Sequence, residues 1–153
     1  MIDKIDRRLI IELQKDGRYS CVTLAKKLGI GTSSVSRRIR RLQKEKIIRV
    51  IAVPNPEKLG LVATAIVAMD IDIDKIDDVC SKLTAYENIL NVAIAFGRYN
   101  VLIEAYHQST EALLNFLKNE LSQIDGIRNI ETFYIAELKK RTYGLLHDRT
   151  PNK

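Results

Sequence analysis

Arginine, lysine and serine side chains recur along one short stretch of this chain at the spacing of a single helix face. At about 100° per residue, four polar side chains between positions 32 and 44 fall on one exposed stripe. They are Ser33, Arg37, Arg40 and Lys44. Cations neutralise phosphates and guanidinium groups donate paired hydrogen bonds to base edges, so the stripe has the chemistry of a DNA-contacting surface. Taken alone, the same run of charge is also consistent with a solvated face without a partner.

The residues around this stripe predict the helices that would position it. Val35, Ile39 and Leu42 form an apolar wedge on the opposite side of the same helix. Ser20 is suited to cap a preceding short helix, and Gly29 to the tight turn between the two. This arrangement is a helix-turn-helix, whose second helix enters the major groove. The predicted DNA contacts are Thr32, Ser33, Ser36, Arg37, Arg40, Arg41 and Lys44 of the second helix, with Lys26 and Lys27 of the first.

The expected roles differ within this set. Arg37 and Arg40 are predicted to reach the groove, whereas Lys26 and Lys27 should contact phosphate only. Arg38 lies nearer the apolar wedge, and we interpret it as a structural or phosphate-contacting residue rather than a base reader.

Charge is distributed unevenly along the 153 residues, whose net charge is +6. Residues 1–60 carry 15 Lys and Arg against 6 Asp and Glu, and residues 61–138 carry 5 against 12. The tail, 139–153, carries 5 against 1. A basic segment followed by an acidic one indicates two domains, of which the first is attracted to a polyanion. We predict a DNA-binding domain at 1–53, a linker at 54–60 and a second domain with a basic tail at 61–153.

Composition and motifs argue against several other classes of protein. An apolar content of 46% supports real cores, and the longest near-apolar run, 61–69, is too short to span a bilayer. The N-terminus is charged and amphipathic, unlike a signal peptide, so we expect a cytoplasmic protein with no membrane partner. Cys21 and Cys80 are too isolated for a disulfide framework or a metal site, and we expect no metal or cofactor.

A small enzyme is a rival interpretation, but no catalytic constellation is visible. His107 and His147 are lone histidines, better explained as a strand residue and a tail residue. The acidic residues at 70–78 fit a solvated strand end and helix start better than a metal site. We therefore expect that the protein is not an enzyme.

The apolar pattern after the helix-turn-helix predicts the remaining elements. β-Branched residues at 47–53 predict the strand of a wing. Beyond the linker, strands are expected at 62–71, 89–96, 101–106 and 130–138, and helices at 76–86 and 109–124. This βαββαβ order is that of a ferredoxin-like sandwich, so we predict an α+β protein with an N-terminal winged helix-turn-helix. One sheet face would be bare and apolar, and the simplest cover is a second copy of the chain.

Taken together, these segments resemble the leucine-responsive/asparagine-responsive regulators, the feast/famine transcription factors of bacteria and archaea, and suggest an archaeal-like member. The resemblance rests on the opening IDKIDRRLIIELQKDGRYS, the segments LAKKLGI and SVSRRIRRLQKEKII, the linker PNPEKLG and the turn FGRYNVLIEA. It implies homodimers, often octamers, formed by sheet packing. It also implies that an amino-acid effector binds between dimers at the turn, with help from the facing helix and the last strand. The expected effector residues are Gly97, Arg98, Tyr99, Asn100, Leu114, Lys118, Thr132 and Phe133.

Three positions depart from the family pattern. Gly31 stands where a capping serine is usual, and Lys46 replaces the usual glycine before the wing, so that helix end must close differently. In the turn, two carboxylates of the family pattern are replaced by Arg98 and Asn100. We therefore expect a more positive site that binds an acidic or amide amino acid, such as glutamate or glutamine, or no effector at all.

These observations favour a sequence-specific, dimeric or higher-order DNA-binding transcriptional regulator modulated by a small amino-acid-like effector. Two-fold symmetry would then require a palindromic operator with half-sites about 34–36 Å apart. The alternative is a chromatin-like architectural protein that binds double-stranded DNA by charge alone and does not respond to an effector.

Overall fold

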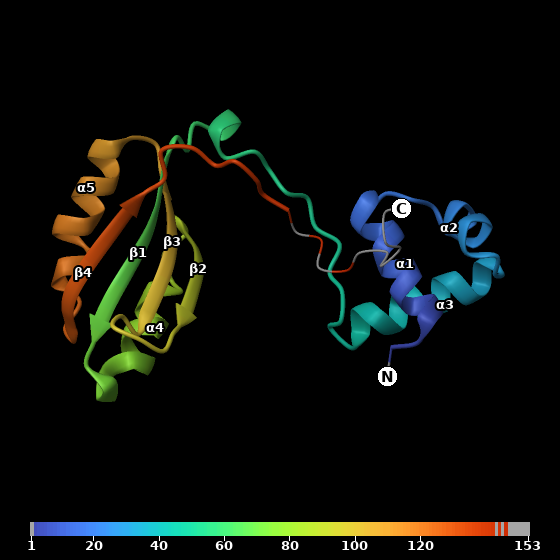
Figure 1. The fold of residues 1–153 in the computed structure, drawn as a ribbon, viewed down its shortest axis with the longest axis horizontal. Coiled ribbons are helices and arrows are strands. Elements are labelled where there is room, and N and C mark those ends of the chain that lie inside the picture. Colours follow the sequence, from blue (N-terminus) through green and yellow to red (C-terminus); the bar gives the residue numbers. More distant parts are fainter. Residues whose placement is uncertain (1, 143, 145, 147–153) are drawn as a thin grey trace, which may run out of the picture. The chain divides into compact units, whose positions relative to one another are not determined.

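The computed structural model describes residues 2–142, 144 and 146, which form two compact units (Figure 1). The first unit contains the residues up to Val53 together with the described residues from Lys140 onward, and the second runs from Pro54 to Lys139. From the sequence, the basic tail is expected in the second domain. Its described residues from Lys140 onward join the first unit instead: Leu146 packs against that unit's core, and the Leu146 N–H donates to Gln14 Oε1 at 3.2 Å.

Three helices build the first unit: α1 (Lys4–Lys15), α2 (Cys21–Leu28) and α3 (Thr32–Lys44). Asp3 caps α1, and Ser20 caps α2 by accepting from the Thr23 N–H at 3.1 Å. Gly29 then turns the chain in the left-handed conformation, with φ of 69°, as the sequence predicts. The helices meet in a small core whose fully buried members are Leu9, Leu24, Val35 and Leu42.

The C-terminal end of α3 closes around a residue other than glycine. Lys46 has φ of 56°, in the left-handed region. Its N–H donates to the Gln43 carbonyl at 3.0 Å, and the Ile47 N–H donates to the Leu42 carbonyl at 2.8 Å. These two bonds make the Schellman motif that glycine usually completes. The expectation of a different closure is therefore wrong, since the backbone adopts the glycine-type geometry despite the lysine side chain.

Replacing Lys46 with glycine should stabilise the first unit by about 0.5–1 kcal/mol, because it removes the steric cost of a side chain in the left-handed region. Urea denaturation of the full chain measures the change. The matched control is Glu45→Gly at φ of −77°, where glycine relieves nothing and should only destabilise. If Lys46→Gly is as destabilising as the control, Lys46 is not strained.

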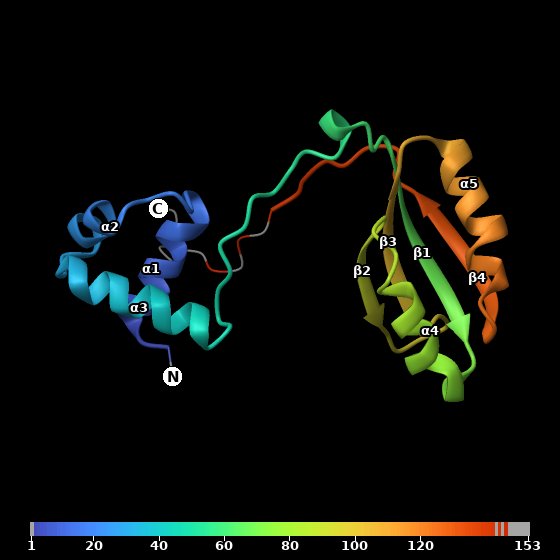
Figure 2. The same ribbon diagram turned by 180° about the vertical axis from the view of Figure 1, so that it is seen from behind.

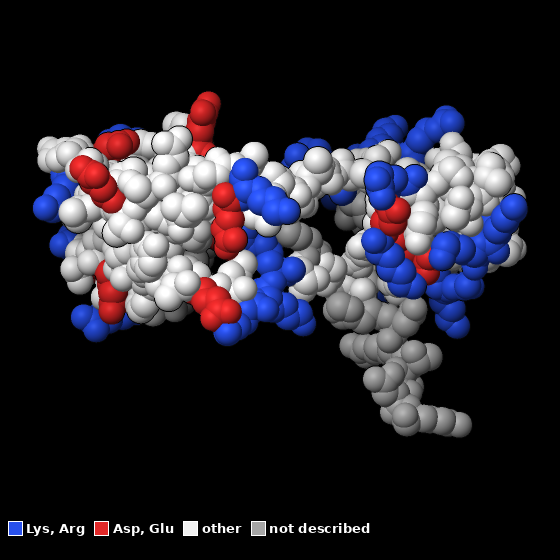
Figure 3. Space-filling view, turned by 90° about the horizontal axis from the view of Figure 1, so that it is seen from above, with Lys and Arg blue, Asp and Glu red and all other residues white. Residues whose placement is uncertain are grey.

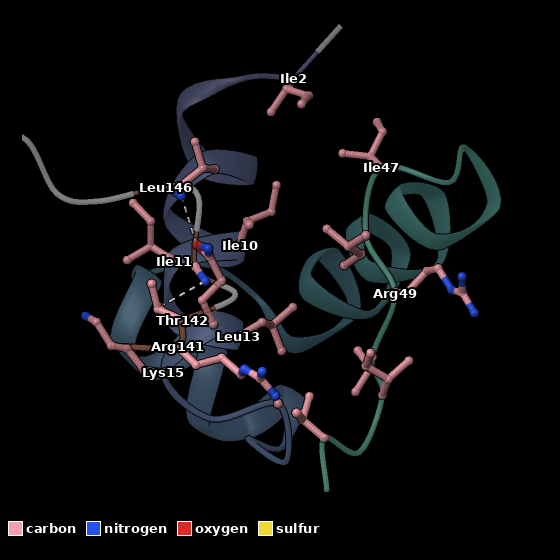
Figure 4. A pocket seen from close by; sticks show the side chains of 17 residues that line it. Ile2, Ile10, Ile11, Leu13, Lys15, Ile47, Arg49, Arg141, Thr142 and Leu146 are labelled. Atoms are coloured by element: carbon pink, nitrogen blue, oxygen red, sulfur yellow. Dashed lines mark hydrogen bonds between the residues drawn. The ribbon is translucent and has the colours of Figure 1, made fainter. Parts of the chain in front are cut away.

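The predicted wing strand is absent from the described residues. Residues 47–53 form no strand: the Ile47 and Ile48 N–H groups donate to the Leu42 carbonyl of α3, and no partner strand for this segment is found among the described residues. The side chains of Val50, Ile51 and Val53 are exposed, that of Ile51 to 64%. This segment, α1 and the tail enclose a largely apolar groove of about 1090 Å³, in which Ile10, Ile11, Ile47 and Leu146 are among the lining residues (Figure 4).

The second unit confirms the predicted βαββαβ order. Its elements are β1 (Ala63–Ile71), α4 (Ile76–Leu83), β2 (Ile89–Ile94), β3 (Val101–His107), α5 (Thr110–Asn119) and β4 (Ile127–Tyr134). The strands form one antiparallel sheet in the order β2-β3-β1-β4. Both helices cover the same face of the sheet (Figure 2), burying Val67, Leu83, Ile103 and Phe116 between the layers. The fold is thus a ferredoxin-like α+β sandwich.

Several boundaries differ from the sequence-based expectation: α4 ends at Leu83 rather than at 86, β2 ends at Ile94 rather than at 96, and β4 ends at Tyr134 rather than at 138. α5 ends at Asn119 rather than near Ile124, and a 3₁₀ turn, Leu121–Gln123, follows it. The apolar pattern continues past the helix because Leu121 and Ile124 still bury their side chains in the core. β4 begins at Ile127 instead of 130, where Ile127 pairs with Ile71 across a bulge.

The helix-free face of the sheet is more polar than the sequence suggests. Here Glu104 Oε2 accepts from Asn91 Nδ2 at 2.7 Å, and Glu104 Oε1 accepts from the Tyr106 hydroxyl. Ile66 and Phe133 face the same side. The expectation of an apolar face considered only β1, whose neighbours contribute these polar side chains. The face is mixed, so its cover must satisfy polar groups as well as apolar ones.

No helix within the described part of the chain is both long and apolar enough to cross a membrane.

Candidate functional site

Helix α3 presents the predicted stripe on its outer side. Val35 and Leu42 are fully buried, which fixes the inner face of the helix. Thr32, Ser33, Arg37, Arg40 and Lys44 are all exposed. Lys and Arg side chains gather over the first unit, whereas acidic ones are spread over the second (Figure 3). The first unit thus offers a rigid helix whose exposed face is cationic, which is the arrangement that phosphate and base contacts require.

Most of the cations on this stripe have no competing partner. Arg40 Nη2 donates to Ser36 Oγ at 3.0 Å, one helical turn back. Within residues 2–142, 144 and 146, neither Arg37 nor Lys44 forms an ion pair. Their charges are therefore available to an anion outside the protein. Gly31 caps α3 without a side-chain hydrogen bond, as the sequence predicts.

The two lysines of α2 differ in their environments. Lys27 Nζ lies 2.9 Å from Glu12 Oε2 and 5.0 Å from the centroid of the Tyr19 ring. The hydrogen bond to Glu12 raises the pKa of Lys27. Lys26 is exposed and makes no ion pair with a described residue. A phosphate-contacting role therefore fits Lys26 better than Lys27, whose charge Glu12 already offsets.

Arg38 and Arg41 of α3 are held by acids of the N-terminal segment. Arg38 Nη1 donates to Asp3 Oδ2 at 2.6 Å and to Asp6 Oδ1 at 2.8 Å, while Arg41 Nη2 donates to Asp6 Oδ2. Burial alone would raise the pKa of Asp6, but the hydrogen bonds from Arg38, the Asp3 backbone and Arg41 hold it below its usual value. Of the two roles that the sequence left open for Arg38, structural or phosphate-contacting, these contacts favour the structural one. Arg41, which the sequence predicts to contact DNA, already donates a hydrogen bond to the Asp6 carboxylate.

Asp6 is the residue of this region that sequence reasoning missed. Among the described residues it is the only charged side chain that is fully buried. A signal was present, because Leu9 and Ile10 follow it by three and four residues and place it on the apolar stripe of α1. An acid inside an apolar stripe requires a buried partner, and the two arginines supply it.

The turn between β2 and β3 is anchored by Asn100. Its Oδ1 accepts from the Ile71 N–H at 2.9 Å, and its Nδ2 donates to the Ile71 carbonyl at 2.6 Å. The Asn100 N–H also donates to the Met69 carbonyl at 3.0 Å. The side-chain amide therefore continues the ladder at the end of β1. This accounts for an amide at Asn100, because a carboxylate has no donor for the Ile71 carbonyl.

Replacing Asn100 with aspartate should destabilise the second unit by about 1–3 kcal/mol near neutral pH, because a carboxylate oxygen would face the Ile71 carbonyl without a proton between them. Thermal unfolding measures the loss. The loss should shrink at acidic pH, where the protonated carboxyl donates. The control is Asn129→Asp, since the Asn129 side chain accepts from the Ile130 N–H at 3.0 Å and donates to no described residue. Equal stability of the two variants would contradict this role.

The predicted effector residues lie on both sides of the sheet. Arg98 Cζ is 5.3 Å from the Tyr99 ring centroid, and the hydrogen-bonding Glu131 carboxylate beside Tyr99 raises the pKa of that phenol. Phe133, two residues beyond Glu131, faces the helix-free side, whereas Thr132 pairs with Val67 and faces the helices. Leu114 and Lys118 are exposed on α5, and Gly97 lies in the turn with φ of 149°. One chain does not bring all eight together.

Glu131 was not among the expected effector residues. It places a carboxylate beside Tyr99, so the site is less positive than the turn residues alone indicate. The described His, Cys, Asp and Glu residues include no group that would hold a metal ion. His107 is packed 4.9 Å from the Phe116 ring centroid and hydrogen-bonds to Asn88 at 2.9 Å, consistent with a structural strand residue.

Comparisons with known proteins give two family matches. Residues 2–43 match the AsnC-type helix-turn-helix domain, and residues 61–147 match a C-terminal dimeric α+β barrel domain. An uncharacterized HTH-type transcriptional regulator of Pyrococcus furiosus is 33% identical over 144 residues, covering 94% of this chain and 97% of that protein. The regulator FL11 of the same organism is 32% identical over 143 residues, covering 93% and 94%.

A solved structure shares the fold of the whole chain. It is a transcriptional regulator of Neisseria meningitidis in complex with L-Met, which superposes with a TM-score of 0.89 at 22% identity. The match covers 95% of this chain and 96% of that one. At this identity the likeness concerns the fold alone.

Proposed function

Because this chain belongs to the Lrp/AsnC family of helix-turn-helix transcriptional regulators, we propose that it binds specific sites on double-stranded DNA as a dimer and responds to a small amino-acid-like effector. The observation that carries the proposal is the exposed face of α3, where Arg37, Arg40 and Lys44 stand opposite a buried wedge. A cationic face on a packed helix is preorganised for the major groove.

Specific binding is tested by selecting bound fragments from the genome that encodes this protein, beginning with its own promoter. A regulator should enrich discrete sites and bind them about 10³-fold or more tightly than bulk DNA. An architectural protein, the alternative, would enrich no site and would bind all fragments with the same steep salt dependence.

A homodimer is the proposed smallest unit. The second unit exposes apolar side chains near the helix-free face and the turn, including Leu90, Ile94, Phe96 and Phe133. A second copy of the chain would cover these side chains. The matching C-terminal domain family is described as a dimeric α+β barrel, which supports this proposal. A palindromic operator follows from two-fold symmetry, and octamers are a further proposed assembly. Sedimentation should find no folded monomer at micromolar concentration, and finding one would overturn the dimer.

The effector is proposed to bind at the turn around Arg98 and Tyr99, completed by residues of another copy. A split site is consistent with the distribution of the eight candidates over both sides of the sheet. Arg98 favours an acidic or amide amino acid over a basic one. Calorimetry against the twenty amino acids should find glutamate or glutamine, and Arg98→Asp should reverse the preference. Tight binding of lysine or arginine by the parent would overturn the assignment.

A further inference from the structure

The ion-pair cluster of Asp3, Asp6, Arg38 and Arg41 lies beside the DNA-facing stripe without belonging to it. Asp6 is fully buried, and its Oδ2 also accepts from the Asp3 N–H at 3.1 Å. On this residue of α1, Oδ1 accepts from Arg38 of α3, and Oδ2 accepts from Arg41 of α3 as well as from the N-cap residue Asp3. A buried carboxylate with several donors has a single favourable geometry, so the cluster fixes how α3 sits on α1.

We propose that Asp6 is a positioning residue for specific DNA binding: it fixes α3 and holds Arg41 at the edge of the stripe, ready to contact a phosphate. The proposal rests on the proposed function, in which α3 enters the groove. It assigns a role in recognition to an acidic side chain that cannot itself touch an anion favourably.

The position of Arg41 supports this role. On the helix it lies about 40° from Arg37 and about 60° from Lys44, at the margin of the stripe. Its side chain is 38% exposed, against 21% for Arg38. One Nη2 hydrogen bond holds it, and its other guanidinium donors have no partner among the described residues. A guanidinium that is already held by one hydrogen bond loses little conformational entropy when its remaining donors bind a phosphate.

Removal of the Asp6 charge should have two effects of opposite sign. The first unit gains one positive charge, which strengthens its attraction to any DNA. At the same time α3 and Arg41 lose their common anchor, which weakens only the contacts that need a defined geometry. A residue that merely supported folding would weaken binding to all DNA alike. The ratio of specific to bulk affinity is therefore the quantity that separates the two roles.

The experiment compares the full-length parent with Asp6→Asn on its best selected fragment and on a scrambled duplex of equal length, across a range of salt concentrations. We expect the specific affinity to fall about tenfold, while the scrambled affinity is unchanged or tighter. The matched control is Glu12→Gln, which makes the same charge change on the same helix. Glu12 binds Lys15 and Lys27 rather than α3, so its loss should leave the ratio unchanged.

A second variant keeps the proposal testable if Asp6→Asn does not fold. Arg41→Gln retains Asp6 paired with Arg38 and should lower the specific affinity more than the scrambled one. When Asp6→Asn and Arg41→Gln are combined, the losses in specific affinity should not add, because both substitutions remove the same contact between Asp6 and Arg41. A parent without a preferred fragment overturns the proposed function. A selective parent whose ratio survives both Asp6→Asn and Arg41→Gln overturns only the role of Asp6.

Discussion

Replacing Arg37 or Arg40 with alanine is expected to weaken binding to the preferred DNA sequence by about 1–3 kcal/mol and to relax the preference at one base pair. Both side chains are exposed on the outer face of α3, and neither is paired with an acid of the described chain. A bidentate contact from such an arginine to a guanine is lost without replacement, because alanine has no donor. The affinity for scrambled DNA should fall less, because there the substitution removes only the attraction between one positive charge and the phosphates.

The control for this prediction is the flanking lysine Lys26, which is expected to contact phosphate alone. Lys26→Ala should weaken binding to every sequence similarly and reduce the salt slope by about one. Lys27→Ala should have a smaller effect because Glu12 already offsets its charge. Titrations of a panel of single-base-pair variants measure all four proteins. If the arginine variants retain the parent's affinity and its preference at every position, the assignment of the stripe is wrong.

The largest effect on stability is expected at Leu42, which anchors α3 to the core of the first unit. It is fully buried, so Leu42→Ala removes transfer free energy and leaves a cavity, at a cost of about 2–5 kcal/mol. The first unit has only a small core, and such a loss should leave it largely unfolded. The second unit has its own core and should keep its structure.

Hydrogen exchange resolved by peptide distinguishes the two units in this variant. Peptides from 1–53 should lose protection, while those from β1 and β3 keep the parent's rates, and DNA binding should be lost. The control is Ile51→Ala in the segment that follows α3, where the side chain is 64% exposed and the cost should be small. If protection falls equally in both units, they do not fold independently.

Local periodicity was sufficient for much of the fold. The spacing of Val35 and Leu42 predicted the orientation of α3, and Ser20 and Gly29 predicted where α2 begins and ends. The βαββαβ order of elements along the second unit also followed from the pattern of apolar runs. These features depend on interactions between residues close in sequence, for which capping and turn preferences are strong.

The remaining features depend on contacts between distant residues. Asp6 meets Arg38 and Arg41 more than thirty positions away, and neither side of that cluster specifies the other in the sequence. Likewise, the anchoring of Asn100 to Ile71 and the approach of Glu131 to Tyr99 arise only once the strands are paired. The prediction of a wing strand at 47–53 was wrong for a related reason. β-Branched residues favour an extended backbone, but a strand also needs a partner strand, which local sequence does not reveal.

The central claim is that the α3 stripe reads DNA sequence, and competition binding at physiological salt tests it most directly. The parent protein is titrated with its best selected genomic fragment in the presence of increasing scrambled duplex, alongside the Arg37→Ala and Arg40→Ala variants. The parent should prefer its fragment about 10³-fold or more, and each variant should reduce that preference by about tenfold or more. A parent preference near one, or a high preference that both variants retain, would contradict the claim.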